Sequence, residues 1–226
     1  MERKDPLIEG ELYHIFNRGV EKRIVFKSQS DFRRFYESLA QFNTTNAALH
    51  SRTKFTTENK KSVDVEVGPR HNKEQKLVSI LAYTLLPNHF HLLLRQESPG
   101  GITEFMRKIG TGYTMYFNKK YVRIGPLFQG KFKSVLVSRD EYYQYIPHYI
   151  HLNVLDATHA GWKNDGISVD QAYNELSAYR WSSAKEYIGN DNHESILAHT
   201  VIDSLFEEKL FNKKILKELL EDDASL

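Results

Sequence analysis

The sequence contains no cysteine, which excludes disulfide bonds, zinc sites built on thiolates and thiol nucleophiles. Its apolar runs are only a few residues long, far short of the roughly 20 that a membrane-spanning helix needs. The opening stretch, MERKDPLIEG, lacks the apolar core of a signal peptide. We therefore expect a soluble, cytoplasmic protein with no membrane partner, in which any bound metal is held by His, Asn, Gln, Asp or Glu.

Acidic residues are scarce in one part of the chain. Residues 101–139 contain eight basic residues and one acid, Glu104, although the net charge of the whole chain is only +2. Aromatic residues are interleaved with these cations, as in a surface that follows phosphates and stacks on bases. A solvated helix face beside core aromatics is the other interpretation of the same pattern. The segment is therefore a candidate nucleic-acid surface.

Hydrophobic periodicity predicts an α+β core. Strands are expected at 11–17, 76–85, 89–95 and 127–137, the second of them central, and helices at 30–42, 102–121 and 140–154. Ser30 or Asp31 is the expected N-cap of the first helix, and Pro147 interrupts the last. This order is the ferredoxin-like (RRM-like) β-α-β-β-α-β pattern with one added helix. Four antiparallel strands with two helices on one face would leave the other face for a site.

We expect residues 1–156 to form the domain that carries the site. A polar, lysine-rich insertion is expected at about 43–75, with a short strand near residues 63–67. Residues 157–226 are expected to form a C-terminal extension that packs on this core and includes an amphipathic helix at about 204–220.

The stretch PNHFHLLL carries two histidines, His89 and His91, just before three leucines. Residues i and i+2 of a strand point to the same face, with α-carbons roughly 6.6 Å apart. Both imidazoles can therefore bind one cation while Phe90 points into the core. An incidental His-x-His in a buried strand is the alternative explanation.

A tyrosine and an asparagine, Tyr149 and Asn153, are spaced four residues apart and would share one helix face. If that helix packs against the two histidines, Asn153 can complete a metal site and Tyr149 can point at a bound phosphate. A phenol is a reasonable nucleophile for reversible phosphoryl transfer. His148 and His151 are further candidates near the site. We expect His151 at the surface, and assistance to proton transfer is the alternative role for it.

These residues lie within a wider resemblance. The sequence resembles the single-tyrosine HUH (histidine, hydrophobic, histidine) transposases, and most closely their REP-associated tyrosine transposase branch. The matching stretches run in order over most of residues 12–187: YHIFNRG, AYTLLPNHFHLLL, YFNKKYVRIGPLFQGKFKSV, DEYYQYIPHYIHLNV, AGW and YRWSSAKEY.

The resemblance implies a metal-dependent endonuclease and strand transferase that acts on single-stranded or hairpin DNA. Carried over by position, His89, His91 and Asn153 match the ligands of Mg²⁺ or Mn²⁺, and Tyr149 matches the nucleophile that forms a 5′-phosphotyrosine. No nucleotide cofactor is implied, and we expect a monomer rather than a homodimer. The candidate contacts to the DNA backbone are Arg18, Arg107, Lys108, Lys119, Lys120, Arg123, Lys131 and Lys133.

Two positions depart from the family pattern. Val154 stands where the family usually has proline after the asparagine, and Pro147 lies two residues before Tyr149. Two other functions fit the residues: a non-catalytic, RRM-like nucleic-acid-binding module, and a metal-dependent phosphodiesterase that uses water.

Overall fold

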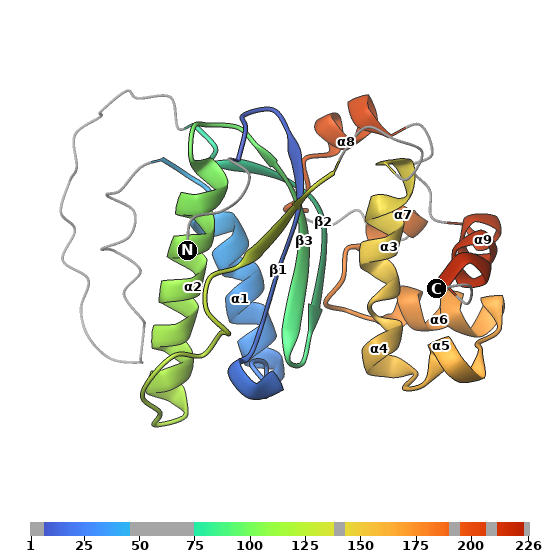
Figure 1. Cartoon of the computed structure of the whole chain (residues 1–226), viewed down its shortest axis with the longest axis horizontal. Coiled ribbons are helices and arrows are strands. Elements are labelled where there is room, and N and C mark those ends of the chain that lie inside the picture. Colours follow the sequence, from blue (N-terminus) through green and yellow to red (C-terminus); the bar gives the residue numbers. More distant parts are fainter. Residues whose placement is uncertain (1–6, 46–74, 138–142, 190–194, 207–211, 224–226) are drawn as a thin grey trace, which may run out of the picture.

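The protein is described by a computed structural model, in which one four-stranded sheet separates two groups of helices (Figure 1). The structure describes residues 7–45, 75–137, 143–189, 195–206 and 212–223. Residues 46–74 of the expected insertion, with the strand expected near 63–67, lie outside these ranges.

The fold class is α+β, as expected. The strands are β1 (Leu12–Arg18), β2 (Val78–Leu86), β3 (His89–Gln96) and β4 (Lys133–Leu136). They lie in the order β2-β3-β1-β4, and each neighbouring pair is antiparallel. The core helices are η1 (Val20–Lys22), α1 (Gln29–Gln41), α2 (Gly101–Lys120), η3 (Tyr143–Tyr145) and α3 (Ile146–Leu152). The helices of the C-terminal part are α4 (Leu155–Thr158), α5 (Trp162–Asp165), α6 (Val169–Ala178), α7 (Ala184–Ile188), α8 (His199–Leu205) and α9 (Lys213–Asp223). Within the described part of the chain, no helix is long and apolar enough to cross a membrane.

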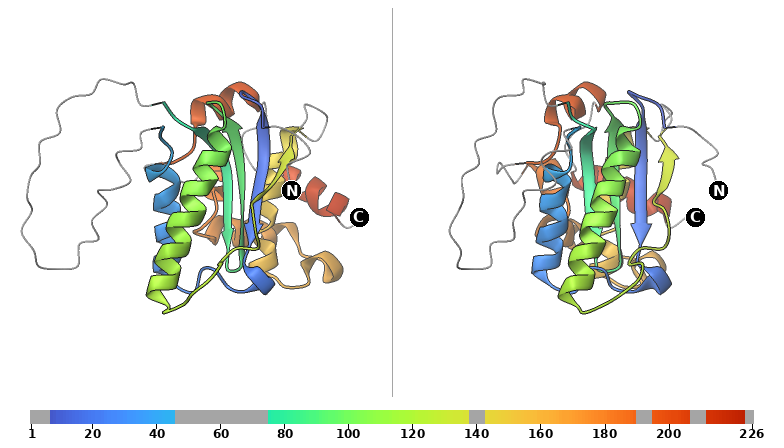
Figure 2. Two further views of the ribbon diagram at one scale, coloured as in Figure 1. Left: turned by 60° about the vertical axis from the view of Figure 1, so that its left-hand side comes forward. Right: turned by 90° about the vertical axis from the view of Figure 1, so that its left-hand side faces the viewer.

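The two faces of the sheet are covered by different helices (Figures 1 and 2). Phe90 of β3 lies 5.0 Å, centroid to centroid, from Phe35 of α1, so its side of the sheet is the one covered by α1 and α2. Successive strand residues point to opposite faces. His89 and His91 therefore point to the other face, against which α3 packs.

The N-cap of helix α1 lies two residues before Ser30 and three before Asp31, the two expected N-caps. Ser28 is the N-cap and Asp31 occupies the third helical position, where its carboxylate accepts the backbone N–H of Ser28 in a capping box. The other carboxylate oxygen of Asp31 accepts from Lys120 at 2.6 Å, which ties α1 to the end of α2. Asp31 is fully buried, so this contact belongs to the core.

The strand expected at 127–137 is shorter than its alternation suggests. Leu127 and Phe128 are buried, but they belong to a loop, and β4 begins only at Lys133. The loop turns at Gly130, whose φ is +71°, and is tied to β1 where Gln129 N–H donates to the carbonyl of Arg18. The buried residues of this stretch therefore line the end of the sheet without joining it.

The observed helices also differ in their bounds from those predicted at 140–154 and 204–220. Helix α3 begins at Ile146, which places Pro147 in the first turn, where no backbone donor is needed. Proline thus starts this helix and does not kink it. In the C-terminal part, α8 ends before Phe206, whose backbone is extended, and α9 is a separate helix.

Strand β2 lies at the edge of the sheet and not at its centre, yet all nine of its residues are buried. Its outer edge is bonded to the C-terminal part of the chain. Leu85 N–H donates to the carbonyl of Trp181, and the carbonyl of Tyr83 accepts from Ser183 N–H. The carbonyl of Ile80 accepts from Ala198 N–H in the same way. The continuous apolar sequence of β2 therefore reflects cover on both faces and along one edge.

Candidate functional site

Three histidines gather on the sheet face that α3 covers. The rings of His89 and His91 are 5.1 Å apart, centroid to centroid, and nearly perpendicular. On the neighbouring strand β1, His14 lies with its ring 5.0 Å from that of His91, and a hydrogen bond of 2.8 Å joins His14 Nε2 to His91 Nδ1. The antiparallel register explains this contact, because Phe16 lies opposite His91 and His14 is its diagonal neighbour.

His89 and His91 each make a hydrogen bond through Nδ1 to a neighbouring side chain. His89 Nδ1–H donates to the side-chain oxygen of Asn88 at 2.6 Å, and His91 Nδ1 bonds to His14. In the described residues, no group hydrogen-bonds to Nε2 of either ring. Histidines that bind metals usually carry an outer hydrogen bond of this kind, which fixes the tautomer and the orientation of the ring. The two rings are thus arranged to present Nε2 lone pairs.

Burial keeps these histidines neutral near physiological pH. It lowers the pKa of His14 to about 4. It lowers that of His91 to about 3, with smaller contributions from charge on His14 and His89. Burial also lowers the pKa of His89, against an opposing effect of Asp156. Neutral imidazole is the form that binds a metal ion.

The candidate nucleophile, Tyr149, lies on α3 beside the same group. Its ring meets His14 edge to face at a centroid separation of 6.3 Å, and its side chain is 43% exposed. One turn later, Asn153 Nδ2 donates to the carbonyls of Tyr149 and Ile150, which leaves Asn153 Oδ1 as the atom of that side chain able to bind a cation. Within the described residues, Asn153 makes no hydrogen bond to His89 or His91.

Several other tyrosines are excluded as nucleophiles by burial. It raises the pKa of Tyr179 to about 12 and raises the pKa of Tyr113 and Tyr187 further still. The hydroxyls of Tyr113 and Tyr187 also donate to backbone carbonyls, so neither is free to attack a substrate. Their environment contrasts with the half-exposed position of Tyr149.

A cavity of about 390 Å³ opens beside His89 and His91. Three cations line it together with the two histidines, namely Arg18, Lys22 and Lys133. Arg18 Nε donates to the side-chain oxygen of Gln129 at 2.5 Å, which fixes the guanidinium at the rim. The cavity therefore combines metal-binding side chains with positive charge.

Lys22 was not among the cations predicted from the sequence, and it lies in an unusual turn. Glu21 and Lys22 both have positive φ, +57° and +58°, a conformation that costs roughly 1–2 kcal/mol for a residue with a side chain. The turn is held from outside, since Gly19 N–H donates to the carbonyl of Asn88 and Val20 N–H to that of Leu127. Strain maintained in this way is common around functional sites.

Three of the predicted DNA contacts have structural partners instead. Lys108 is buried, and its ammonium donates to the carbonyl of Thr44 at 2.8 Å. Lys120 is engaged by Asp31, and the guanidinium of Arg123 donates to Asn118 Oδ1 and to a loop carbonyl. Lys108 belongs to the packing of the helices, so the structure contradicts its predicted place on the DNA surface. Lys120 is exposed while it pairs with Asp31 and stays a predicted DNA contact. Arg123 stabilises the loop that follows α2.

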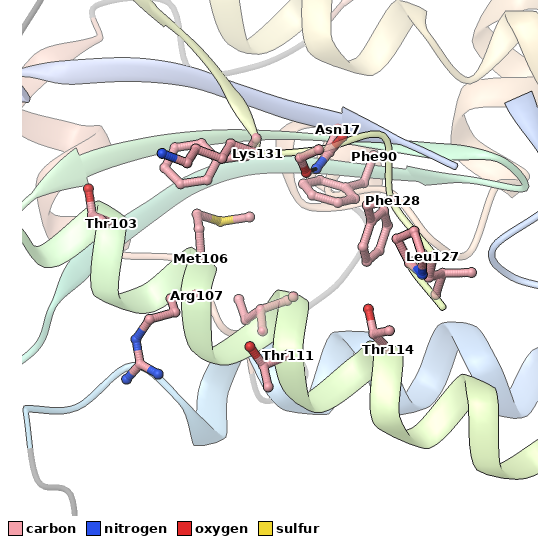
Figure 3. A pocket seen from close by; sticks show the side chains of 15 residues that line it. Asn17, Phe90, Thr103, Met106, Arg107, Thr111, Thr114, Leu127, Phe128 and Lys131 are labelled. Carbon is pink, nitrogen blue, oxygen red and sulfur yellow. Dashed lines mark hydrogen bonds between the residues drawn. The ribbon is translucent and has the colours of Figure 1, made fainter. Parts of the chain in front are cut away.

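The remaining predicted cations lie away from the histidines. Arg107 and Lys131 line a second cavity, of about 790 Å³, between α2 and the loop before β4 (Figure 3). Phe90 contributes to it from the sheet, so this cavity lies on the opposite face from His89 and His91. Arg107 pairs with Glu104 at 2.7 Å, and Lys119 is exposed on α2.

The chemistry of His89 and His91 fits a metal ion, whereas the described hydrogen bonds of Asn153 run to α3 carbonyls and not to either ring. In the described ranges, no group of three or more His, Asp or Glu side chains is arranged to hold a metal. The fit rests on the hydrogen bonds at Nδ1 of His89 and His91, which leave Nε2 of each ring as the nitrogen that can bind a metal. Those partners, Asn88 and His14, were not predicted. Asn88 could have been found from its place beside His89, whereas His14 required the register of β1 against β3.

Comparisons with known proteins agree with this arrangement. Residues 47–153 match the family model described as "Transposase IS200 like". A comparison with curated proteins gave no significant match. A solved structure described as "Structure of the REP associates tyrosine transposase bound to a REP hairpin" aligns with a TM-score of 0.50 at 12% sequence identity, over 87% of this chain and 93% of that one. Residues 47–153 are therefore similar to the IS200-like transposase family, and the fold of the chain resembles that of a REP-associated tyrosine transposase.

Proposed function

We propose that this protein cuts and rejoins single-stranded DNA through a covalent tyrosine intermediate. The observation that carries the proposal is the group formed by His89, His91 and Tyr149. The two imidazoles, each with a partner on Nδ1, line a cavity that three cations also line, and the half-exposed ring of Tyr149 meets His14, the partner of His91. A metal-dependent tyrosine transposase needs these parts together.

His89, His91 and Asn153 would hold Mg²⁺ or Mn²⁺, the histidines through Nε2 and the asparagine through Oδ1. The bound cation would polarise a nonbridging oxygen of the scissile phosphate and stabilise the charge that develops there. Asn88 and His14 hold the two rings in position for this role.

Tyr149 would carry the covalent step. Its phenolic oxygen attacks the phosphorus and loses its proton, while the bond from phosphorus to the 3′-oxygen breaks and that oxygen leaves as a hydroxyl. The products are a 5′-phosphotyrosine and a free 3′-hydroxyl. Attack by a 3′-hydroxyl on the phosphotyrosine reverses the step and gives strand transfer.

Single-stranded DNA beside a hairpin is the proposed substrate. The printed description of the similar structure names a REP hairpin as the molecule bound to that protein. In this chain, Arg18, Lys22 and Lys133 would neutralise backbone phosphates at the cavity. Arg107, Lys119 and Lys131 remain candidates for contacts farther from the histidines.

We also propose that residues 1–156 form the catalytic domain, that residues 157–226 support it as an extension, and that the protein acts as a monomer. The helix that carries Tyr149 packs against β2 and β3, and a hydrogen bond from α3 to Ser183 gives the C-terminal part a role in holding this helix. His151 contributes to this packing: contrary to its expected surface position, it is fully buried and bonded to Ser183 Oγ at 2.8 Å.

The experiment incubates the protein with end-labelled, hairpin-bearing single-stranded DNA and Mn²⁺ and looks for a covalent protein–DNA adduct on a denaturing gel. Tyr149→Phe should abolish the adduct. Tyr145→Phe is the matched control, because Tyr145 lies one turn earlier with a similar exposure of 37%, against 43% for Tyr149. That variant should keep the adduct.

Other outcomes separate the alternatives. An adduct that survives Tyr149→Phe would assign the nucleophile to another residue, and cleavage without an adduct would support a phosphodiesterase that uses water. Binding without cleavage, over a range of metals and hairpins, would support a binding module. In the described structure, α3 covers the sheet face that an RRM domain uses for stacking bases, which argues against that module.

A further inference from the structure

We propose that His14 is a positioning residue. Its Nε2 accepts a hydrogen bond from Nδ1–H of His91, which directs the Nε2 lone pair of His91 to the metal, and its ring packs against the nucleophile. The inference rests on the proposed function, because it assigns a further residue to the same site. His14 lies on β1, outside the segment that matches the family model.

The geometry gives His14 one polar contact to a ligand ring. His14 Nε2 and His91 Nδ1 are 2.8 Å apart, and the rings stack with an angle of 26° between their planes. A neutral imidazole has one N–H and one lone pair, so one of the two nitrogens in this bond must carry the proton. If His91 binds a cation through Nε2, its proton lies on Nδ1, and His14 Nε2 is then the acceptor.

The second ligand ring supports this assignment. His89 Nδ1 faces Asn88 Oδ1, which can only accept, so His89 must carry its proton on Nδ1. The side chains of His89 and His91 point to the same face of β3. Since Nδ1 of each ring is already hydrogen-bonded, both rings would bind a common cation through Nε2 and carry their proton on Nδ1. His14 therefore does for His91 what Asn88 does for His89.

His14 also contacts the nucleophile. The ring of Tyr149 stands at 84° to that of His14, with centroids 6.3 Å apart, so the edge of one ring meets the face of the other. His14 is 9% exposed, and its ring is the described contact between β1 and Tyr149 of α3. A single side chain thus sets the orientation of a metal ligand and limits the position of Tyr149.

The first test measures Mn²⁺ binding directly, from the loss of the free-ion signal in electron paramagnetic resonance. His14→Phe keeps a ring of similar volume but removes the acceptor, and it should weaken Mn²⁺ binding about 10- to 100-fold. His14→Gln can place an oxygen near the position of Nε2, so its affinity should be within a few-fold of wild type. Phe16→Leu is the control, since Phe16 also stacks on His91, at 5.7 Å, without a hydrogen bond.

Phe16→Leu should bind Mn²⁺ with nearly wild-type affinity. If wild-type protein binds Mn²⁺ and His14→Phe binds equally well, the inference is wrong while the proposed function stands. If wild-type protein does not bind Mn²⁺, the metal site itself is wrong and the inference is lost with it.

A second measurement needs no substitution at His14. Long-range ¹H–¹⁵N spectra of the metal-free wild-type protein distinguish the two imidazole tautomers, and the His91 signals are assigned by their loss in His91→Gln. A proton on Nδ1 of His91 supports the inference. A proton on Nε2 would overturn it even if His14→Phe failed to fold.

Discussion

Acidification should destabilise the protein through His14 and His91. Their folded-state pKa values of about 4 and about 3 lie below the 6.5 of an exposed histidine, so the unfolded chain binds more protons and stability falls as the pH drops below 6.5. At pH 5 an unfolded histidine is almost fully protonated while these two remain neutral. Each should therefore lower the free energy of unfolding by about 2 kcal/mol between pH 7.5 and pH 5.

Urea unfolding at the two pH values, in EDTA, tests this reasoning by comparing variants. His14→Gln removes one of the two groups, so its loss of stability between pH 7.5 and pH 5 should be smaller than that of wild type by about 2 kcal/mol. Phe16→Leu changes the packing of the same strand but removes no titratable group. The difference in free energy of unfolding between this variant and wild type should therefore be the same at both pH values. An acid-induced loss in His14→Gln as large as in wild type would refute the assigned protonation of His14.

Three further predictions concern other positions. Asp31→Asn should lower the free energy of unfolding by about 3 kcal/mol in a urea titration, because the amide nitrogen that replaces one buried carboxylate oxygen cannot accept the hydrogen bonds made there; a loss below 1 kcal/mol would contradict the role of this carboxylate. Gly101→Ala should destabilise by about 2 kcal/mol or more, since its Cβ would lie 2.2 Å from the carbonyl oxygen of Leu77, and an unchanged thermal midpoint would argue against this close approach. Lys22→Asn should stabilise by up to about 1 kcal/mol, because asparagine tolerates positive φ, while it weakens binding to single-stranded DNA in fluorescence anisotropy; unchanged affinity would remove Lys22 from the DNA surface.

The elements that could be predicted from the sequence are those whose pattern is local. The alternation in β1 and β3 and the helical spacing in α2 locate these elements to within one or two residues. Strand β2 was misplaced within the sheet because its apolar sequence does not reveal what covers it. Its partners, such as Trp181, lie about a hundred residues away in the chain.

The residues of the candidate site also differ in whether local sequence or long-range contacts determine their position. That His89 and His91 share a face follows from strand periodicity alone, and their role was suggested by family resemblance. His14 could not be predicted, because its contact with His91 depends on the register of two strands far apart in sequence. The burial of Lys108 and the ion pair of Lys120 could not be predicted, because their partners, Thr44 and Asp31, come from a different part of the chain.

The bonding of β2 to the C-terminal part has a consequence for self-association. An open strand edge can pair with a second copy of the same chain, and proteins protect such edges by covering them or by keeping them short and charged. Here β2 is covered by Trp181, Ser183 and Ala198, whereas β4 is four residues long and begins with Lys133 at the proposed DNA cavity. Among the described strands, β4 is therefore the edge at which two copies could join their sheets, and pairing there would compete with the proposed binding of DNA.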